Sequence, residues 1–236
     1  MALLKQAVIT GASAGIGRAT ARLFVAKGWK VLNLSRRPCD EEGVQNLLGD
    51  LSECAHTDEF AEKLADVVAD VDILCLIHNA ARLEKDSTID IDHRQFEAVM
   101  RMNISVPSSI NRILIPLMRE GSSTLYVGST LSEQAVPGAL SYVVSKHALL
   151  GMMRATCQDL ANHGVHTACI CPGFTDTDML RTHLGNDPET MQAVADMSAF
   201  SRLVKPEEIA STLFFAANTP AINGSVLHVN LGQVGK

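Results

Sequence analysis

The amino-acid sequence predicts an α/β fold: a doubly wound, predominantly parallel seven-stranded sheet flanked by helices. Seven short, β-rich runs alternate with longer helical stretches along the chain. Several of these runs, residues 73–77 among them, are apolar nearly throughout, as strands covered on both faces should be. Alternation of strands and helices favours parallel strands that are joined by right-handed crossovers.

The expected strands span residues 7–10, 30–35, 45–50, 72–78, 124–129, 166–171 and 225–230, and the expected helices span residues 16–27, 58–69, 96–118, 142–163 and 206–218. Gly28 and Gly164 fall just beyond two of these helices, where a glycine in the left-handed conformation ends a helix. Residues 175–203 depart from the pattern because they are polar, contain methionines and lack a regular period. We expect an irregular, mobile segment that covers the substrate over the ends of the strands, where ligands of α/β proteins bind.

A length of 236 residues fits one domain over residues 1–236, and a composition of 47% apolar and 19% charged residues is typical of a globular chain. No apolar stretch approaches the roughly 20 residues that a membrane-spanning helix needs, so no membrane partner is expected. The first ten residues lack the features of a signal peptide, and we therefore expect a cytoplasmic protein. A net charge of −6 argues against a nucleic-acid partner.

Cysteines and histidines give no indication of a metal site. The six cysteines lie at positions 39, 54, 75, 157, 169 and 171, mostly in apolar segments, which favours buried free thiols in a reducing compartment. Cys169 and Cys171 alternate along a strand and would share one face, so a redox pair is the less favoured interpretation. None of the eight histidines has zinc-site spacing. We expect His78, His147 and His183 to be packing or surface residues, with no metal bound.

Three glycines, Gly11, Gly15 and Gly17, follow the first expected strand and open the first expected helix. Glycine tolerates positive φ and lets the backbone approach a pyrophosphate, whose charge the N-terminus of a helix favours. The spacing GxxxGxG differs from the GxGxxG fingerprint, and a glycine-rich turn alone is also compatible with an ordinary strand–helix joint. Its position after the first strand of a βαβ pattern favours dinucleotide binding.

The end of the second expected strand bears on the choice of dinucleotide. A site that prefers NAD places an acid there to hold the ribose 2′-hydroxyl. This chain has Ser35 instead, followed by Arg36 and Arg37, whose guanidinium groups suit a 2′-phosphate. The alternative is a pair of solvated arginines offset by the acids at positions 40–42. The sequence therefore favours NADP(H), with NAD(H) left open.

An ordered set of motifs resembles the short-chain dehydrogenase/reductase family along essentially the whole chain. The set is TGASAGIG at residues 10–17, Asn79-Ala80, Asn103, Ser129, Tyr142-x-x-x-Lys146 and Pro172-Gly173. The resemblance implies a Rossmann-type fold, a nicotinamide cofactor and the interconversion of alcohols and carbonyls. Many members are tetramers or dimers, so we expect a homo-oligomer.

Carried over by position, the resemblance also implies a set of cofactor-binding residues. The turn on the phosphate side would comprise Gly11, Ser13, Gly15, Ile16 and Gly17. Ser35, Arg36 and Arg37 would meet the adenosine ribose, and Asp50 and Leu51, at the end of the third strand, would meet adenine. Beside the nicotinamide and its ribose would lie Asn79, Ala80, Tyr142, Lys146, Pro172, Gly173, Thr175 and Thr177.

Two stretches depart from the family pattern. The chain has His78-Asn79-Ala80-Ala81 where the family usually has Asn-Asn-Ala-Gly, and an alanine at position 81 loses the freedom to adopt positive φ. The segment Asn230-Leu231-Gly232 stands where many relatives carry Asp-Gly-Gly, so the packing of this part of the chain could differ.

The catalytic candidates are Asn103, Ser129, Tyr142 and Lys146. Reduction of a carbonyl needs a hydride, which the cofactor supplies, and a proton, for which Tyr142 is the candidate carrier. An ordinary phenol has a pKa near ~10, and a neighbouring cation favours its ionised form. Lys146 lies one helical turn later, so the two side chains share a face. Ser129, expected to close the fifth strand, would hydrogen-bond the substrate oxygen. The resemblance gives Asn103 the task of holding a water in a proton path.

The function that we expect is an NADP(H)-dependent oxidoreductase interconverting a carbonyl and an alcohol. One alternative is a catalytically silent, nucleotide-sensing regulatory protein of the same fold. Another is an isomerising or dehydrating enzyme, although such relatives usually carry a longer substrate domain. Residues 131–140 and 175–203 would border the small-molecule substrate, whose identity the sequence leaves open.

Overall fold

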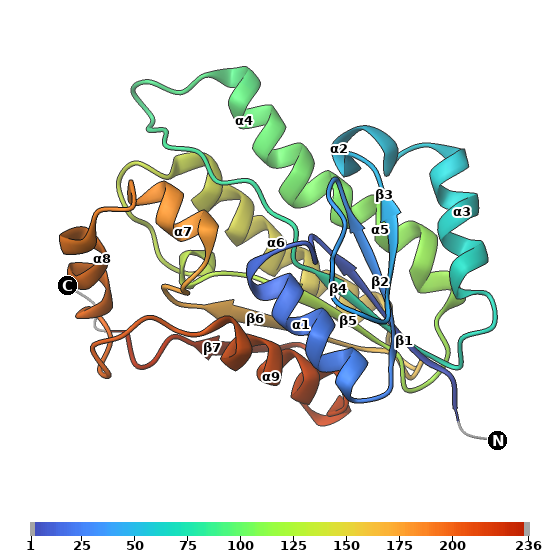
Figure 1. Ribbon diagram of the computed structural model, residues 1–236. Helices are drawn as coiled ribbons and strands as arrows, with labels where there is room; N and C mark the ends of the chain where they lie inside the picture. The colour runs from blue at the N-terminus through green and yellow to red at the C-terminus, as the bar shows by residue number, and fades with distance from the viewer. Residues whose placement is uncertain (1–2, 234–236) are drawn as a thin grey trace.

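The computed structural model describes residues 3–233, which form a three-layer α/β structure around one seven-stranded sheet (Figure 1). The strand order is β3-β2-β1-β4-β5-β6-β7, and every neighbouring pair is parallel. The strands are β1 Lys5–Thr10, β2 Lys30–Ser35, β3 Val44–Leu48, β4 Ile73–His78, β5 Ser123–Val127, β6 His166–Pro172 and β7 Ser225–Val229. The predicted fold class is confirmed.

Helices cover both faces of the sheet. They are α1 Gly15–Ala26, α2 Leu51–Cys54, α3 Asp58–Val68, α4 His93–Met100, α5 Val106–Leu114, α6 Leu140–Asp159, α7 Asp178–His183, α8 Pro188–Ala195 and α9 Pro206–Ala217. Short helical segments are η1 Arg101–Ser105, η2 Ile115–Leu117, η3 Thr130–Ser132 and η4 Pro220–Ile222. Figure 1 shows α1 and α9 together on one face and α3, α5 and α6 on the other. None of the helices in residues 3–233 combines the length and the apolar character that crossing a membrane requires.

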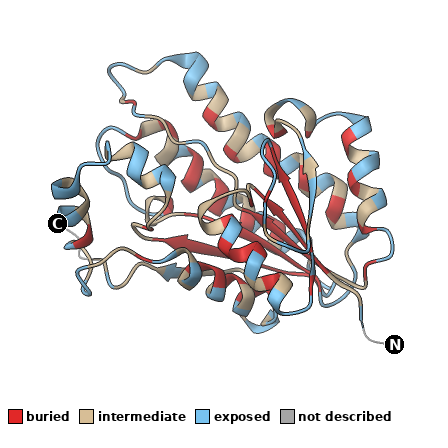
Figure 2. Ribbon diagram, viewed as in Figure 1, coloured by how far each residue is buried: buried red, intermediate tan, exposed pale blue. Residues whose placement is uncertain are grey.

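Alternation along each strand builds a separate core on each face. Ala7 and Ile9 of β1 pack into the core beneath α1 and α9, whereas Val8 packs into the core beneath α3 and α5. Successive strand side chains point to opposite faces, so one apolar run can serve both cores. The strands in the middle of the sheet are therefore almost entirely buried (Figure 2).

One expected helix is interrupted. The stretch predicted as a single helix over residues 96–118 begins three residues earlier, at His93, where Asp92 caps α4. It then passes through the π-helical segment η1 before α5 begins. Pro107 has no N–H to donate to the carbonyl four residues before it, which is that of Asn103. A wider turn results, in which the Val106 N–H bonds the Arg101 carbonyl, five residues back.

We expect residues 175–203 to be irregular from the sequence, and this prediction is wrong, because the segment contains α7 and α8. Both helices are short, which hides their period, but both have sequence signals for their start. The Thr177 side chain accepts from the Leu180 N–H to cap α7. Asp187 caps α8, and Pro188 occupies its first turn.

The two departures from the family pattern have different outcomes. Ala81 does not belong to the residues with positive φ, so its backbone needs no glycine. Leu231 does adopt a left-handed conformation, with φ of 53°, which costs a non-glycine residue about 1–2 kcal/mol. Its side chain packs against the core beneath α9, and that contact offsets part of the strain.

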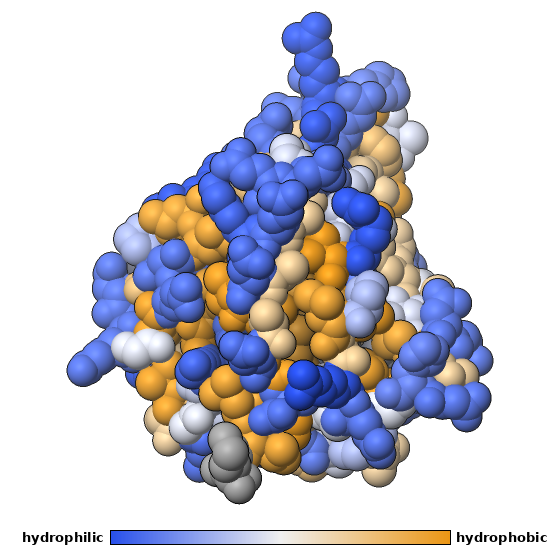
Figure 3. Space-filling view, turned by 90° about the vertical axis from the view of Figure 1, so that its right-hand side faces the viewer, coloured by the Kyte–Doolittle hydropathy of each residue, from blue (hydrophilic) through white to orange (hydrophobic). Residues whose placement is uncertain are grey.

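The two ends of the strands differ in character. Figure 3 shows the side of the molecule on which β1 begins, where apolar and polar side chains are interspersed over the surface. The motifs singled out in the sequence lie at the other, carboxyl end of the strands.

Candidate functional site

The predicted site residues come together because the sheet is parallel. The strands β1, β4, β5 and β6 are consecutive in the sheet, and their carboxyl ends therefore meet at one edge. The order of strands reverses beside β1, since the chain passes outward to β2 and β3 and then returns to β4. Such a switch point is where open α/β sheets bind ligands.

The glycine turn joins β1 to α1 at this switch point. Gly11 and Gly15 have φ values of +71° and +53°, which only glycine adopts freely. A Cβ at Gly17 would collide with the Gly11 carbonyl oxygen and would come within 2.6 Å of the Asn79 amide nitrogen. The N-cap residue Ala14 forms no side-chain bond, and the first turn of α1 carries no acid. Ser13 and Ile16 lie in the same turn, which therefore fits a pyrophosphate.

Asn79 and Thr10 hold this turn against the end of β4. The Asn79 side-chain amide donates to the carbonyls of Thr10 and Gly11, at 3.0 and 3.1 Å. The Thr10 hydroxyl accepts from the N–H groups of Asn79 and Ala80, each at 2.9 Å. Asn79 thus shapes the glycine turn, and its side-chain amide is used in doing so.

The expected adenosine side lies at the ends of β2 and β3. Ser35 donates its hydroxyl proton to the Arg37 carbonyl, which shapes the turn that carries the two arginines. Arg36 is exposed, with its guanidinium 4.0 Å from the Asp50 carboxylate. Asp50 caps α2 rather than ending β3, and Leu51 is buried. The pKa of Asp50 is lowered mainly by the hydrogen bond that the Ser52 hydroxyl donates to its carboxylate, and the charge of Arg36 adds to the effect.

Tyr142 and Lys146 occupy the first turns of α6. The Lys146 ammonium lies 5.4 Å from the centroid of the Tyr142 ring, so both groups occupy one compartment. Lys146 is only 3% exposed, and its Nζ donates to the Val127 carbonyl at 2.8 Å. A buried ammonium is thereby fixed beside the phenol ring.

Ser129 lies two residues after Val127, whose carbonyl accepts from the Lys146 ammonium. It does not close β5, which ends at Val127, but is the N-cap residue of η3. Its hydroxyl accepts from the Leu131 N–H at 3.1 Å, and its own N–H donates to the Ser132 hydroxyl. The short helix therefore orients the serine at the edge of the sheet that Lys146 also faces.

Asn103 lies in the π-helical segment and is 2% exposed. Its side-chain oxygen accepts from the Arg82 N–H at 2.8 Å. Its amide donates to the Arg82 carbonyl at 3.0 Å and to the Ser145 hydroxyl at 2.9 Å. Ser145 in turn donates to the Tyr142 carbonyl at 2.8 Å. Asn103 is thus joined to the backbone of Tyr142 through one serine, and π-helical turns occur often at functional sites.

The loop after β6 packs against the glycine turn. A Cβ at Gly15 would meet the Thr177 methyl group at 3.2 Å, which places the two loops in contact. Thr175 is buried and donates to the Gly173 carbonyl. A Cβ at Gly173 would come within 2.7 Å of the Asn230 side chain, so only glycine fits at this position. Pro172 ends β6 directly before it.

Two thiols lie beneath Gly128, next to Ser129. The sulfurs of Cys169 and Cys171 are 3.8 Å apart, and all six cysteines are free. Donation from the Cys169 thiol lowers the pKa of Cys171. A Cβ at Gly128 would meet both sulfurs within 2.8 Å, so the thiols fill the space below the serine loop.

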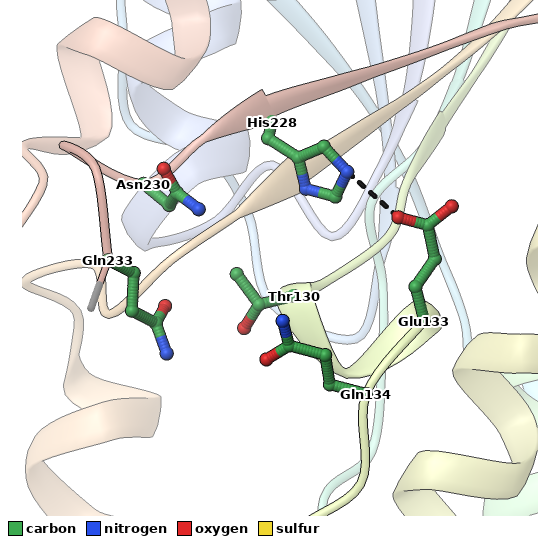
Figure 4. A pocket seen from close by; sticks show the side chains of 6 residues that line it. All are labelled: Thr130, Glu133, Gln134, His228, Asn230 and Gln233. Atoms are coloured by element: carbon green, nitrogen blue, oxygen red, sulfur yellow. Dashed lines mark ion pairs between the residues drawn. The ribbon is translucent and has the colours of Figure 1, made fainter. Parts of the chain in front are cut away.

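Two pockets border the site. One, shown in Figure 4, is lined by Thr130, Glu133, Gln134, His228, Asn230 and Gln233. There the His228 imidazole lies 2.9 Å from the Glu133 carboxylate, which joins β7 to the end of η3. The other, of about 330 Å³, is lined by Lys85, Asp86, Ser87, Asp90, Pro137, Gly138 and His183. It lies between the loop after β4, the loop before α6 and the end of α7.

Sequence patterns did not indicate Asn33 or Ser145 as site residues, and they gave Thr10 only as the first letter of the glycine motif. Asn33 lies within β2, where its amide bonds Ser35 and its oxygen accepts from the Ala12 N–H at 2.9 Å. It therefore couples the glycine turn to the arginine turn. A buried asparagine in an otherwise apolar strand is the signal that could have identified it. For Ser145, the position three residues after Tyr142 is a weaker signal of the same kind.

The chain matches known proteins along nearly its whole length. Residues 11–233 match the family model described as enoyl-(acyl carrier protein) reductase. The chain is 28% identical over 241 residues to the 3-oxoacyl-(acyl-carrier-protein) reductase FabG of Vibrio cholerae, with 97% of each covered. It is 27% identical to the protein of that name from Escherichia coli, with 97% of each covered.

Two solved structures show the same fold. The ligand-free aldohexose dehydrogenase of Thermoplasma acidophilum superposes with a TM-score of 0.89 at 25% identity, over 98% of this chain and 94% of that one. A short chain dehydrogenase family protein from Francisella tularensis superposes with a TM-score of 0.86 at 24% identity, over 97% and 98%. Since the family model extends from the glycine turn to Gln233, the chain belongs to the short-chain dehydrogenase/reductase family, whose members are oxidoreductases that use a nicotinamide cofactor.

Proposed function

We propose that this protein is an NADP(H)-dependent oxidoreductase that interconverts a carbonyl and an alcohol. The observation that carries the proposal is the buried Lys146 ammonium, held by the Val127 carbonyl beside the Tyr142 ring. An ammonium in that place can stabilise the negative charge that develops on a phenol oxygen as it gives up its proton.

The residues of this chain then divide the work of the reaction. The nicotinamide, when bound, supplies or accepts the hydride. Tyr142 gives its hydroxyl proton to the developing alkoxide oxygen of the substrate, or takes it back in oxidation. Ser129 donates a hydrogen bond to the same oxygen where charge develops. Lys146 stabilises the phenolate that remains, and Asn103 fixes the helix turn that presents Tyr142 through Ser145.

Replacing Tyr142 by Phe tests this mechanism. Turnover should fall by about 10²–10⁴-fold, because the proton carrier is lost, while the dissociation constant for NADPH changes little. Turnover is followed by NADPH absorbance and binding by fluorescence titration. A Tyr142→Phe enzyme with the wild-type rate would refute the role of the phenol. Tight binding of NADPH with no turnover by the wild type on any carbonyl would favour the silent regulatory protein.

The preference for NADP(H) rests on Arg36 and Arg37, two exposed guanidinium groups at the end of β2. Asn33, Ser35 and their hydrogen bonds hold the turn that carries them. Arg36→Ala should raise the dissociation constant for NADPH about tenfold or more, because a charge-assisted contact to the 2′-phosphate is lost, and leave that for NADH nearly unchanged. Equal changes for the two cofactors would rule out this contact.

Substrate and assembly are parts of the same proposal. The names of the relatives point to a 3-oxoacyl thioester and to an aldohexose, so a panel of ketones, aldehydes, β-keto thioesters and sugars is the first assay, with NADH as control. We expect a homo-oligomer, tetramer or dimer, and a cytoplasmic location. Sedimentation equilibrium measures the first of these.

A further inference from the structure

Helix α6 lacks a cap of its own. The N-cap residue Ala139 has no side chain that could bond to the free N–H groups of the first turn, in which Tyr142 lies. The missing acceptor comes from Asp86, in the segment between β4 and α4. Its Oδ1 accepts from the Ser141 N–H at 3.0 Å, across a separation of 55 residues.

The backbone of Asp86 is bonded to the same place. Its N–H donates to the Gly138 carbonyl, and its carbonyl accepts from the Leu140 N–H, both at 3.3 Å. Asp86 and Ala139 therefore form a short parallel bridge at the point where α6 begins. Three hydrogen bonds join one residue to the start of the helix.

Asp86 is buried, with 5% of its surface exposed, although it carries a carboxylate. Its second oxygen, Oδ2, has no hydrogen-bond partner within residues 3–233. Burying a charge costs free energy unless a partner compensates it, and the N-terminus of a helix is such a partner for an anion. The position of Asp86 therefore depends on the start of α6 as much as the helix depends on Asp86.

A second connection leads from the same segment to the same turn. Arg82, four residues before Asp86, is held through its N–H and its carbonyl by Asn103. Asn103 bonds Ser145, and Ser145 bonds the Tyr142 carbonyl. The segment 82–86 is thus joined to α6 on both sides of Tyr142 along the chain, at Ser141 and at Ser145.

We propose that Asp86 is a positioning residue for Tyr142. By capping α6 it fixes the first helical turn, and so the place of the phenol relative to Lys146 and Ser129. The inference rests on the proposed function, in which Tyr142 transfers the proton. A shift of about 1 Å in a catalytic group can cost a factor of about a hundred in rate.

Asp86→Ala removes the acceptor and Asp86→Asn keeps one, because an amide oxygen can also accept a hydrogen bond from the Ser141 N–H. We expect Asp86→Ala to lower kcat about tenfold to a hundredfold, with the KM for NADPH within about twofold of wild type. Asp86→Asn should restore kcat to within about threefold of wild type. The matched control is Asp92→Ala, which removes the exposed carboxylate that caps α4 at the Arg94 N–H and should leave kcat unchanged.

Hydrogen–deuterium exchange of the peptide spanning residues 139–146 provides a readout that needs no turnover. Exchange should become faster in Asp86→Ala and stay at the wild-type rate in Asp86→Asn and Asp92→Ala. If the wild-type enzyme turns over none of the carbonyls, the proposed function fails, but the exchange rates still test the cap.

Three results would overturn the positioning role. They are an unchanged kcat in Asp86→Ala, unchanged exchange in that variant, or an Asp86→Asn enzyme as slow as Asp86→Ala. Should Asp86→Ala fail to fold, Asp86→Gln replaces it, because its longer side chain displaces the acceptor. It must then show both the slower kcat and the faster exchange.

Discussion

Gly17 and Gly151 are both helix residues, but they differ in what surrounds them. A Cβ at Gly17 would come within 2.6 Å of the Asn79 amide and 2.9 Å of the Ala12 Cα, and neither can move without opening the turn. A Cβ at Gly151, in the middle of α6, would meet nothing within 4 Å. The first glycine is required by close packing, whereas the second only weakens its helix.

Opposite effects should therefore follow from two identical substitutions. Gly17→Ala should lower the free energy of unfolding by about 1–3 kcal/mol, because an added methyl group crowds a packed turn, and should weaken binding of NADPH. Gly151→Ala should raise it by about 0.5–1 kcal/mol through helix propensity. Urea unfolding of both variants measures the difference. Destabilisation of similar size at both positions would contradict this view of the glycine turn.

Among single residues, the sequence predicted those that belong to motifs of fixed spacing. Tyr142 and Lys146 are one helical turn apart in any helix, so their proximity needed no knowledge of the fold. Asp86 could not be predicted in the same way, because its partner is a backbone N–H 55 residues away. Contacts to backbone atoms leave no residue-type signal at the second position.

Between β4, β5 and the helices α5 and α6 lies a chain of buried hydrogen bonds. His78 donates from Nε2 to the Asn111 side-chain oxygen at 2.8 Å, and Asn111 donates to the Tyr126 hydroxyl at 2.8 Å. Thr156 gives its own proton to the Met152 carbonyl, so Tyr126 must donate to Thr156. Each proton in this chain has one possible direction, so Nε2 of His78 carries a proton, whereas Nδ1 has no hydrogen-bond partner within residues 3–233.

Burial lowers the pKa of His78 from the ordinary 6.5 to about 4. The unfolded chain therefore binds a proton at His78 before the folded chain does as the pH falls. The contribution of neutral His78 to the free energy of unfolding is fully present above pH 6.5. It is lost progressively between about pH 6.5 and pH 4, and the loss is about 2 kcal/mol at pH 5.

His78→Gln, which keeps a donor for Asn111, should remove this part of the pH dependence. The measurement is the free energy of unfolding at pH 7 and pH 5 for wild type and variant. His147→Gln is the control, because it removes a histidine that lies exposed on α6, outside the buried chain of hydrogen bonds. An equal loss of stability at pH 5 in wild type and His78→Gln would count against a buried neutral histidine.

The boundaries of elements were predicted less well than their existence. All seven strands occur in the expected order, within a few residues of the expected bounds. The expected helix 96–118 is broken because Pro107 removes one backbone donor, an effect that hydrophobic periodicity does not register. The two helices within residues 175–203 are too short for a helical period to be recognised, although the residues that cap them are visible in the sequence.

The molecule as a whole should respond to its cofactor as a single cooperative unit, since the glycine turn, β4 and the loop after β6 are in direct contact. NADPH at about 100 times its dissociation constant should add about 2.7 kcal/mol to the free energy of unfolding. For a chain of this size the melting temperature should rise by about 5–10 °C. Differential scanning fluorimetry measures the shift.

NADH at the same concentration should give a smaller shift, and Arg36→Ala should reduce the NADPH shift to that level. Equal shifts with the two cofactors in the wild-type protein would leave no basis for a preference at the end of β2.

The fold itself followed from alternation and apolar runs, because a parallel sheet leaves a strong pattern. The site's finer geometry did not, because it depends on where the loops at one sheet edge meet.

The pairing of Thr175 with Val204 has a practical consequence for engineering. The chain leaves the sheet region and returns to it at adjacent points, with bonds from the Asp176 N–H to the Val204 carbonyl and from the Val204 N–H to the Phe174 carbonyl. The two ends of the stretch that carries α7 and α8 are therefore held together by backbone hydrogen bonds, so the stretch can be exchanged as a unit. Grafting the equivalent stretch of another family member onto this scaffold is a route to altered ligand range that leaves the seven strands untouched.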